Sequence, residues 1–249
     1  MDWRDEGVLL TARRHGEDAA IIEVLTAAHG RHAGVVRGGS SRRMAPALQP
    51  GTQLSVEWRA RLESHLGAYR VEPARSRAAA LMTEGDALAA MGSVAALLCA
   101  YLPERDPHPA LYAATVGLLD RLGVSADWPE AYIGWEVMLL AELGFPLDLS
   151  ACAATGATDG LKWVSPRTGK AVSAAAGAPY ADRLLPLPGF LAGEESDANA
   201  LRAGLRMTGH FLRQWVAPGF GAETPPKARD RLVERLSRRG VGRETDLPD

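Results

Sequence analysis

The sequence predicts an α+β protein in which a five-stranded antiparallel barrel precedes an all-α domain. Up to about residue 75, apolar and polar residues alternate in five short runs, with no intervening segment long enough for a crossover helix. From Arg75 onward alanine becomes frequent and the apolar period moves toward 3.6, which is typical of helices. The 249 residues fit one large domain or two small ones, so we expect a barrel over residues 1–77 and a helical domain over residues 78–249.

The strand signal is clearest in the fourth run, where the apolar and polar positions separate onto two faces. The apolar face is expected to carry Leu54, Val56, Trp58, Ala60 and Leu62. The other runs cover residues 8–13, 19–26, 31–37 and 66–72, and the last is expected to stop at Pro73. The OB-fold is the five-stranded member of the small antiparallel barrels, although other small barrels share this period.

Five segments of the second domain have a helical period. They cover residues 81–102 (one helix, or a pair kinked at Gly92), 111–122, 127–144, 197–215 and a strongly basic 227–239. Residues 150–190 break the pattern, because Ala, Gly, Ser, Thr and Pro dominate there. They contain one β-like hairpin, 161–164 with 169–172, and are expected to form an insertion or sub-domain.

The composition excludes several classes of protein. Apolar residues make up 47% of the chain, which is enough to fill a core. The two cysteines, Cys99 and Cys152, exclude a disulfide framework and indicate a reducing compartment. The start is charged and lacks an apolar signal segment, and the longest apolar stretch, residues 87–102, is shorter than the ~20 residues of a membrane span. We therefore expect a cytoplasmic protein without a membrane partner.

No motif for catalysis or for cofactor binding is found. Arg42 stands where a G-x-S-x-G motif needs its second glycine, no G-x-G-x-x-G occurs, and the stretch before Ala171 lacks the P-loop residues. His29 and His32 form an H-x-x-H across a strand turn with no other ligands nearby, so they are expected to be turn residues rather than metal ligands. We expect no enzyme activity and no cofactor.

Basic residues concentrate in one segment although the net charge of the chain is only −2. Residues 31–80 hold nine Arg and three Glu, a net charge of +6. Such an excess can bind polyanions. The alternative is a solvated face in a chain that uses arginine in preference to lysine.

The loop of residues 37–43 has the composition of a phosphate-binding loop. Its glycines leave backbone N–H groups accessible, its serines add hydroxyl donors, and guanidinium groups match phosphate oxygens. Arg59 and Arg61 are two apart on a strand and would extend the same groove, which predicts nucleic-acid contact through Arg37, Arg42, Arg43, Arg59 and Arg61. The competing interpretation is a flexible connection with solvated arginines. Trp58 is expected in the core, whereas Tyr69 fits either the core or a base-stacking position.

The order of these parts resembles the DNA repair protein RecO family over nearly the whole chain. Residues 5–10 resemble the family's opening strand, and residues 34–43 with 48–51 resemble its basic loop and the segment after it. Residues 135–136 and 143–149 resemble the helix and exit that precede its insertion. Residues 152–156 stand where many members carry C-x-x-C-G, with Thr155 in place of the second Cys. It implies an N-terminal OB-fold, a C-terminal helical domain and a zinc-ribbon-like insertion over residues 150–180.

The resemblance also implies a function. Family members are not enzymes in the bond-making sense, bind single- and double-stranded DNA, and anneal complementary strands. They engage the acidic tail of single-stranded DNA-binding protein and, with RecR, help load the recombinase RecA, which implies a cytoplasmic, nucleoid-associated protein. The competing class is a protein-interaction scaffold or an RNA-binding accessory factor, because backbone contacts are common to DNA and RNA.

Two features bear on this resemblance. A structural zinc site needs four thiolate or imidazole ligands, but the family positions here read Cys152, Thr155, Ser173 and Ala176, so we expect no zinc. The tail of single-stranded DNA-binding protein, acidic with an apolar end, needs an apolar groove rimmed by cations. The segment 201–215 offers Arg202, Arg206 and Arg213 beside an apolar stripe, unless these are plain solvated surface.

Overall fold

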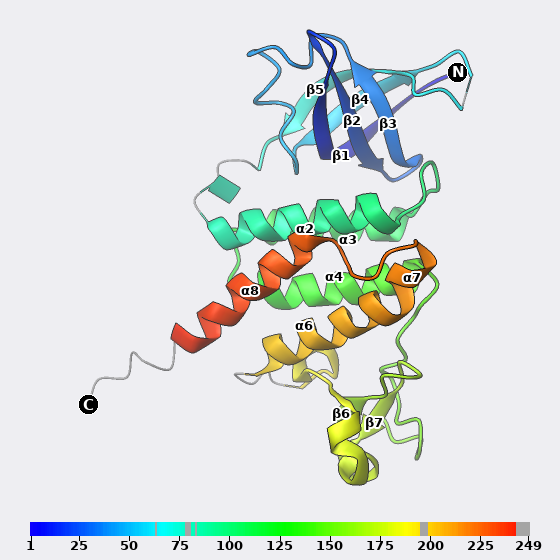
Figure 1. Ribbon diagram of the computed structural model, residues 1–249, viewed down its shortest axis with the longest axis vertical. Helices are drawn as coiled ribbons and strands as arrows, with labels where there is room; N and C mark the ends of the chain where they lie inside the picture. The colour runs from blue at the N-terminus through cyan, green and yellow to red at the C-terminus, as the bar shows by residue number, and fades with distance from the viewer. Residues whose placement is uncertain (63, 78–80, 83, 195–198, 243–249) are drawn as a thin grey trace. The chain divides into compact units, whose positions relative to one another are not determined.

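The computed structural model describes residues 1–62, 64–77, 81–82, 84–194 and 199–242 (Figure 1). The chain divides into two compact units, Met1–Ser125 and Ala126–Asp249. The first contains β1 (Asp2–His15), β2 (Ala19–Thr26), β3 (Gly30–Val36), β4 (Gln53–Arg59), β5 (Ala68–Arg75), α2 (Gly85–Tyr101) and α3 (Pro109–Arg121). A five-stranded sheet followed by a helical C-terminal region confirms the predicted α+β class.

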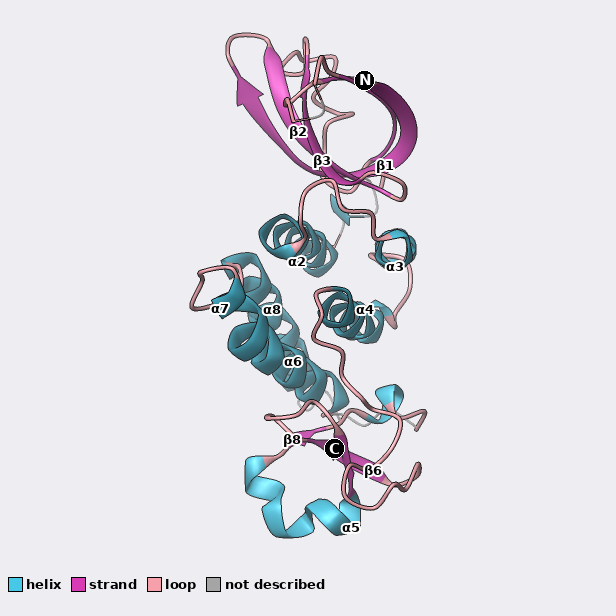
Figure 2. Cartoon of the chain, turned by 90° about the vertical axis from the view of Figure 1, so that its right-hand side faces the viewer, coloured by secondary structure: helices cyan, strands magenta, loops and turns pink. Residues whose placement is uncertain are grey.

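The five strands close into a barrel in the order β1-β2-β3-β5-β4, and Figure 2 shows β1, β2 and β3 curving around it. Four neighbouring pairs are antiparallel, but β3 and β5 run parallel, with Val36 opposite Tyr69. The prediction of a wholly antiparallel barrel is therefore wrong at this pair. Residues 37–52 connect β3 to β4 across the barrel, so that β4 pairs with β1 rather than with β3. Because β5 is antiparallel to β4, it then lies parallel to β3.

Alternate strand residues fill the barrel interior, as the period of two predicts. Leu54, Val56 and Trp58 are buried together in one apolar cluster, which confirms the core position of Trp58. Tyr69 is also buried in this cluster, and its hydroxyl donates to the backbone carbonyl of His32 at 3.3 Å. Tyr69 is therefore a core residue.

Two strand ends differ from the prediction. The fourth strand stops at Arg59, because the chain turns there and the Ala60 N–H bonds the carbonyl of Met1. Leu62, which was expected on the apolar face of this strand, lies beyond its end and is 54% exposed. The fifth strand continues through Pro73 to Arg75, because a register shift opposite residues 53 and 54 forms a bulge beside the proline.

Helices α2 and α3 belong to the same unit as the barrel. The single-helix alternative is the one observed for α2, which passes through Gly92. Arg77 is buried and ties three parts of this unit together: its Nε donates to Asp120 of α3 at 2.7 Å and its Nη1 to the carbonyl of Gly51 at 2.9 Å.

The second unit contains helices and a small sheet. Its elements are α4 (Trp128–Glu142), β6 (Leu161–Val164), β7 (Ala171–Ser173), α5 (Ala174–Gly177), η1 (Ala178–Arg183), β8 (Leu185–Pro186), η2 (Gly189–Leu191), α6 (Ala200–Phe211), η3 (Leu212–Val216), α7 (Ala217–Gly219) and α8 (Lys227–Gly242). The predicted hairpin is β6 with β7, and β8 adds an unpredicted third strand in the order β7-β6-β8. Residues 212–216 form a π-helical turn where a continuous α-helix is predicted. None of the helices in the described ranges is long and apolar enough to cross a bilayer.

Candidate nucleic-acid interface

The 37–43 loop is anchored on the turn between β1 and β2. Ser40 donates its N–H to the carbonyl of Asp18 at 3.0 Å and its hydroxyl to that of Ala19 at 2.7 Å. The N–H of Gly39 bonds the carbonyl of Val36 at the end of β3, and that of Ser41 bonds the carbonyl of Gly38. Three N–H groups and one hydroxyl of the loop are therefore occupied within the fold, and the loop exposes Ser41 and its three arginines to solvent.

A groove on the barrel surface brings together two predicted arginines and one that was missed. It measures about 520 Å³, and Arg37, Arg59 and Arg70 line it together with Glu57. Its apolar floor consists of Val36, Met44, Ala68, Tyr69 and Val71. Arg70 lies opposite Glu57 in the β4–β5 ladder, on the outward face of β5. The period of two in residues 66–72 already placed Arg70 on an exposed face, so the sequence held this signal.

Carboxylates offset part of the charge in this groove. Arg59 contacts Glu57 at 2.7 Å and lies 3.9 Å from Asp2, and Arg4 approaches Glu57 at 3.4 Å. These side chains are largely exposed on the arginine side, so solvent screens the pairs. Among the described residues, Arg37 and Arg70 have no ion pair. Within the described part of the chain, they are the arginines of this groove for which no ion pair is seen, although Glu57 lies across the ladder from Arg70.

The remaining predicted residues lie beside this groove. Arg59 and Arg61 line an adjoining hollow with Met1, Asp2 and Ala60, so Arg59 belongs to both concavities. Arg42 and Arg43 are exposed in the turn that follows Arg37, and neither lines the groove. The structure thus brings Arg37, Arg59 and Arg61 onto connected hollows and leaves Arg42 and Arg43 on the adjacent loop.

Five rings gather at the barrel, and from the sequence only Tyr69 among them was considered as a base-stacking residue. Trp3 stacks on His29 with ring centroids 4.0 Å apart, and His32 meets Trp58 edge-to-face at 4.6 Å. Tyr69 packs edge-on to Trp3 at 5.9 Å. His29 lies in the β2–β3 turn as predicted, whereas His32 is a buried residue of β3, so the predicted turn position of His32 is wrong. Nowhere in the described ranges do three or more His, Cys, Asp or Glu side chains gather as metal ligands would.

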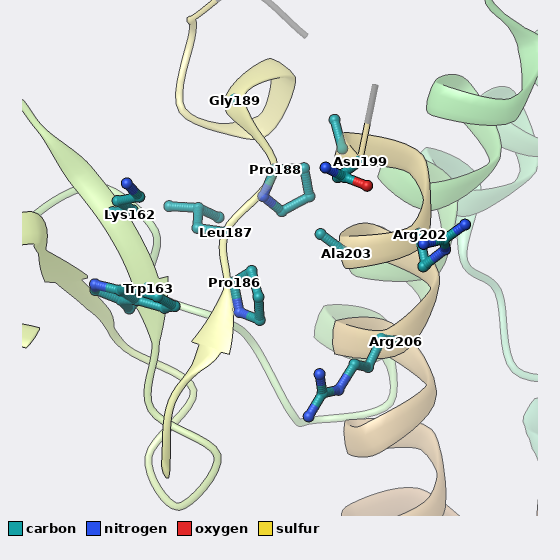
Figure 3. Close-up of a pocket in the computed structure, with 11 residues that line it drawn as sticks. Lys162, Trp163, Pro186, Leu187, Pro188, Gly189, Asn199, Arg202, Ala203 and Arg206 are labelled. Carbon is teal, nitrogen blue, oxygen red and sulfur yellow. The ribbon is translucent and has the colours of Figure 1, made fainter. Parts of the chain in front are cut away.

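A second candidate site lies in the second unit, between α6 and the small sheet (Figure 3). This pocket of about 280 Å³ has an apolar wall of Trp163, Pro186, Leu187 and Pro188, and Lys162, Arg202 and Arg206 are its cations. In Figure 3, Arg206 extends from α6 toward the strand that carries Trp163. Lys162 and Trp163 were not predicted, since the hairpin gave no sign that it faces α6.

The three predicted partner-binding arginines do not share one pocket. Arg206 lines the apolar pocket and also a more polar hollow of about 480 Å³, in which Arg213 lies with Asp230 and Glu234. Arg202 lines only the first of these two. The indole Nε1 of Trp163 is buried without a hydrogen-bond partner among the described residues. Arg202 and Arg206 are therefore the pair that flanks an apolar surface.

Three of the four residues at the family's zinc positions, Cys152, Thr155 and Ser173, are joined by hydrogen bonds. The Cys152 thiol is buried and accepts the Ser173 N–H at 3.2 Å. Hydrogen bonds from the Ser173 and Thr155 side chains and the Ser173 backbone lower the pKa of Cys152 to about 6. Zinc needs four thiolate, imidazole or carboxylate donors, whereas this cluster offers one thiol, two hydroxyls and Ala176. The donor set does not fit a structural zinc ion.

Comparison with known proteins finds relatives in the family of recombination protein O. The family model described as recombination protein O N terminal matches residues 1–77, and that described as recombination protein O C terminal matches residues 82–222. Two relatives named DNA repair protein RecO, from Ruegeria sp. (strain TM1040) and Roseobacter denitrificans, are 56% and 55% identical over 96% of this chain and 100% of their own length. A third of that name, from Jannaschia sp. (strain CCS1), is 54% identical over 97% of this chain and 98% of its own.

The two models match residues of both units, and each of these relatives matches the chain over almost its full length. The chain therefore belongs to the recombination protein O, or RecO, family of DNA repair proteins.

Proposed function

We propose that this protein is a non-enzymatic recombination mediator that binds and anneals single-stranded DNA and helps load a recombinase on strands coated with single-stranded DNA-binding protein. In this proposal residues 1–77 are an OB-fold that binds DNA, and residues 78–249 are a helical domain with a degenerate zinc-ribbon-like insertion at 150–180. The observation that carries it is the groove in which Arg37, Arg59 and Arg70 lie together over an apolar floor. RecR and, indirectly, RecA are the partners we propose, with duplex DNA as a second ligand.

Charge neutralisation explains why such a surface promotes annealing. Two complementary strands repel each other through their phosphates, and guanidinium groups that contact both strands reduce this repulsion and release counterions. Guanidinium contacts to phosphate carry no sequence information, so one surface serves every pair of complementary strands. Arg42 and Arg43, exposed beside the groove, are placed to extend the same contact.

Replacing Arg42 and Arg43 by Ala is expected to weaken single-strand binding about tenfold at low salt, the equivalent of one phosphate contact shared by two arginines that do not line the groove. The slope of log affinity against log salt should fall by about 0.7, the change expected for one lost phosphate contact on a single strand. Fluorescence anisotropy at several salt concentrations measures both, and an annealing assay with strands coated by single-stranded DNA-binding protein tests the function. Arg167→Ala with Arg183→Ala removes two exposed charges from the second unit as a control. An unchanged slope in the Arg42/Arg43 variant would exclude the loop from the interface.

The apolar pocket beside α6 is our proposed site for the acidic tail of single-stranded DNA-binding protein. Trp163, Leu187 and the two prolines supply an apolar surface for the end of the tail, and Arg202 and Arg206 supply cations for its acidic residues. Arg213 would contribute from the adjoining hollow.

Arg206→Glu is expected to weaken binding of that peptide by at least ~10-fold, because it replaces an attraction by a repulsion at the pocket rim. Isothermal titration with the synthetic tail measures the affinity. Arg167→Glu makes the same charge change at an exposed position outside both hollows and should leave the affinity unchanged. Equal affinities of the Arg206→Glu variant and the unmodified protein would remove Arg206 from the site.

A further inference from the structure

A third hollow on the barrel differs in kind from the arginine groove. It has a volume of about 200 Å³ and is lined by Trp3, His29, His32 and Trp58, with Met1, Ala28 and Arg105. Four of these seven residues are planar rings, and Arg105 is the only residue among them with a permanent side-chain charge. A pocket of this size and lining suits a single planar, mostly uncharged group.

The rings are fixed before any ligand arrives. The Trp3 and His29 rings are parallel within 7°, and the Nδ1 of His29 lies 3.2 Å from the Asp5 carboxylate. His32 is wedged against both Trp3 and Trp58. Burial lowers the pKa of His32 below its ordinary value, so this ring is neutral near pH 7. Trp3 and His29 are partly exposed, whereas His32 and Trp58 are almost completely buried, so the walls are rigid and their immobilisation costs no further entropy when a ligand binds.

One side-chain donor of Arg105 has no hydrogen-bond partner in the part of the chain that the structure describes. Its Nη2 donates to the carbonyl of His65 at 3.1 Å, but its Nε is buried and has no hydrogen-bond partner among the described residues. An unsatisfied buried donor is unfavourable, so a ligand that brings an acceptor to this nitrogen would be stabilised there. The backbone of Arg105 is also in the left-handed region, with φ at +64°, which is uncommon for a residue with a side chain.

The surrounding chain holds Arg105 in this conformation. Its N–H donates to the carbonyl of Arg31 in β3 at 2.8 Å, and Arg31 Nε donates to the carbonyl of Leu102 at 3.0 Å. Gly30 lets the two segments touch, because a Cβ there would lie 2.1 Å from the carbonyl oxygen of Asp106. The segment after α2 is thus fastened to the β2–β3 turn, and this places Arg105 at the pocket.

The pocket adjoins the arginine surface. Met1 lines both this pocket and the hollow that contains Arg59 and Arg61, and Arg59 in turn lines the groove with Arg37 and Arg70. A polyanion lying along these arginines would therefore pass the mouth of a pocket lined by rings.

We infer that this pocket receives one unpaired nucleobase of a bound single strand, held among the rings of Trp3, His29, His32 and Trp58 with a base carbonyl or ring nitrogen accepting from Arg105 Nε. The inference rests on the proposed DNA binding and adds a contact that a phosphate chain alone cannot make. A paired base cannot leave the duplex without an unstacking cost, so the pocket favours single strands over duplex.

The test compares two ligands of equal charge and length: a ten-residue thymidine oligonucleotide and a ten-residue strand of abasic sites. The protein should bind the thymidine strand about tenfold more tightly, as expected for one buried and stacked base. Arg105→Ala and, separately, Trp3→Leu should abolish this preference while leaving the affinity for the abasic strand within about twofold. Arg183→Ala, an exposed arginine of the second unit, should keep the full preference. The abasic strand also serves as a folding control, because a misfolded variant would lose both ligands.

Each outcome decides between the two claims. Equal binding of the two strands by the unmodified protein, or a preference that survives in both variants, would overturn the base pocket and leave the arginine groove standing. Failure to bind either strand would overturn the proposed DNA binding and this inference with it. Loss of preference in Arg105→Ala alone, with the abasic affinity retained, supports the pocket even if Trp3→Leu unfolds.

Discussion

Replacing Arg229 by Ala is expected to lower the free energy of unfolding of the second unit by about 3–5 kcal/mol, because it leaves a buried carboxylate without its counter-charge. Glu136 of α4 is fully buried, and Arg229 of α8 donates to its two oxygens at 2.6 and 2.9 Å. Tyr132 donates to the same carboxylate at 2.7 Å, and Thr208 of α6 also bonds it. One carboxylate thus joins three helices of this unit.

The charge of Arg229 persists although burial opposes it. Desolvation disfavours the guanidinium cation, but the attraction and hydrogen bonds of Glu136 outweigh it and raise the pKa of Arg229 above its ordinary value. Arg229 also donates to the carbonyl of Leu205 at 2.9 Å, and Gly209 leaves the space for its guanidinium, since a Cβ there would lie 2.7 Å from Nη1. Removal of Arg229 therefore takes a charged donor away from acceptors on two helices and leaves the Glu136 carboxylate with hydroxyl donors alone.

Urea unfolding and amide hydrogen exchange in α4 and α8 measure this effect. Arg238→Ala, which removes an exposed arginine of the same helix, should change the stability by less than ~0.5 kcal/mol. Adding Glu136→Gln to an Arg229→Met variant should recover much of the loss, because the neutral amide needs no counter-charge. Its oxygen can still accept from Tyr132, and its NH2 group can donate to the Thr208 hydroxyl, which itself donates to the carbonyl of Gly204. Unchanged exchange in α8 after Arg229→Ala would contradict a role for this pair in holding the helix.

The local pattern of apolar residues predicted the strands and their buried faces, because these depend on neighbouring residues alone. The alternation of residues 54–58 identified a strand whose inner face includes Trp58, and the structure places that residue in the core. The parallel pairing of β3 with β5 depends on where a 16-residue connection returns the chain, and no short-range pattern encodes it. Glu136 and Arg229, 93 positions apart, are an extreme case, because each reads alone as an ordinary charged residue.

The candidate site shows the same division. Glu57 and Arg59 are two apart on one strand face, so their ion pair was accessible to sequence reasoning and was overlooked. The role of Arg105, in contrast, could not be predicted from the sequence. Its position depends on the contact of Asp106 with Gly30, which joins segments 76 residues apart, and no motif marks either side. Binding surfaces built from one strand can be predicted, whereas pockets built by a long-range contact cannot.

Removing the unpaired cations of the groove should have the largest effect on DNA binding. Arg37→Ala combined with Arg70→Ala is expected to weaken single-strand affinity roughly 100-fold at low salt, since each contact between a guanidinium and a phosphate contributes ~1.5 kcal/mol. The salt slope should fall by about 1.4 as two phosphate contacts are lost. Arg59→Ala is expected to have a smaller effect, because Glu57 already offsets part of the charge of Arg59.

Anisotropy titrations of the three variants against one oligonucleotide, at salt concentrations from 50 to 200 mM, test this ranking. Removal of Arg59 also leaves Glu57 without its partner, and the free carboxylate would repel phosphate. Arg59→Ala alone therefore combines a lost contact with a new repulsion. The Arg59→Ala/Glu57→Gln double variant removes this repulsion and measures the lost contact by itself. If that double variant loses more affinity than Arg37→Ala/Arg70→Ala, then the paired cation is the main phosphate contact. The strand would in that case follow the hollow of Arg59 and Arg61 rather than the groove of Arg37 and Arg70.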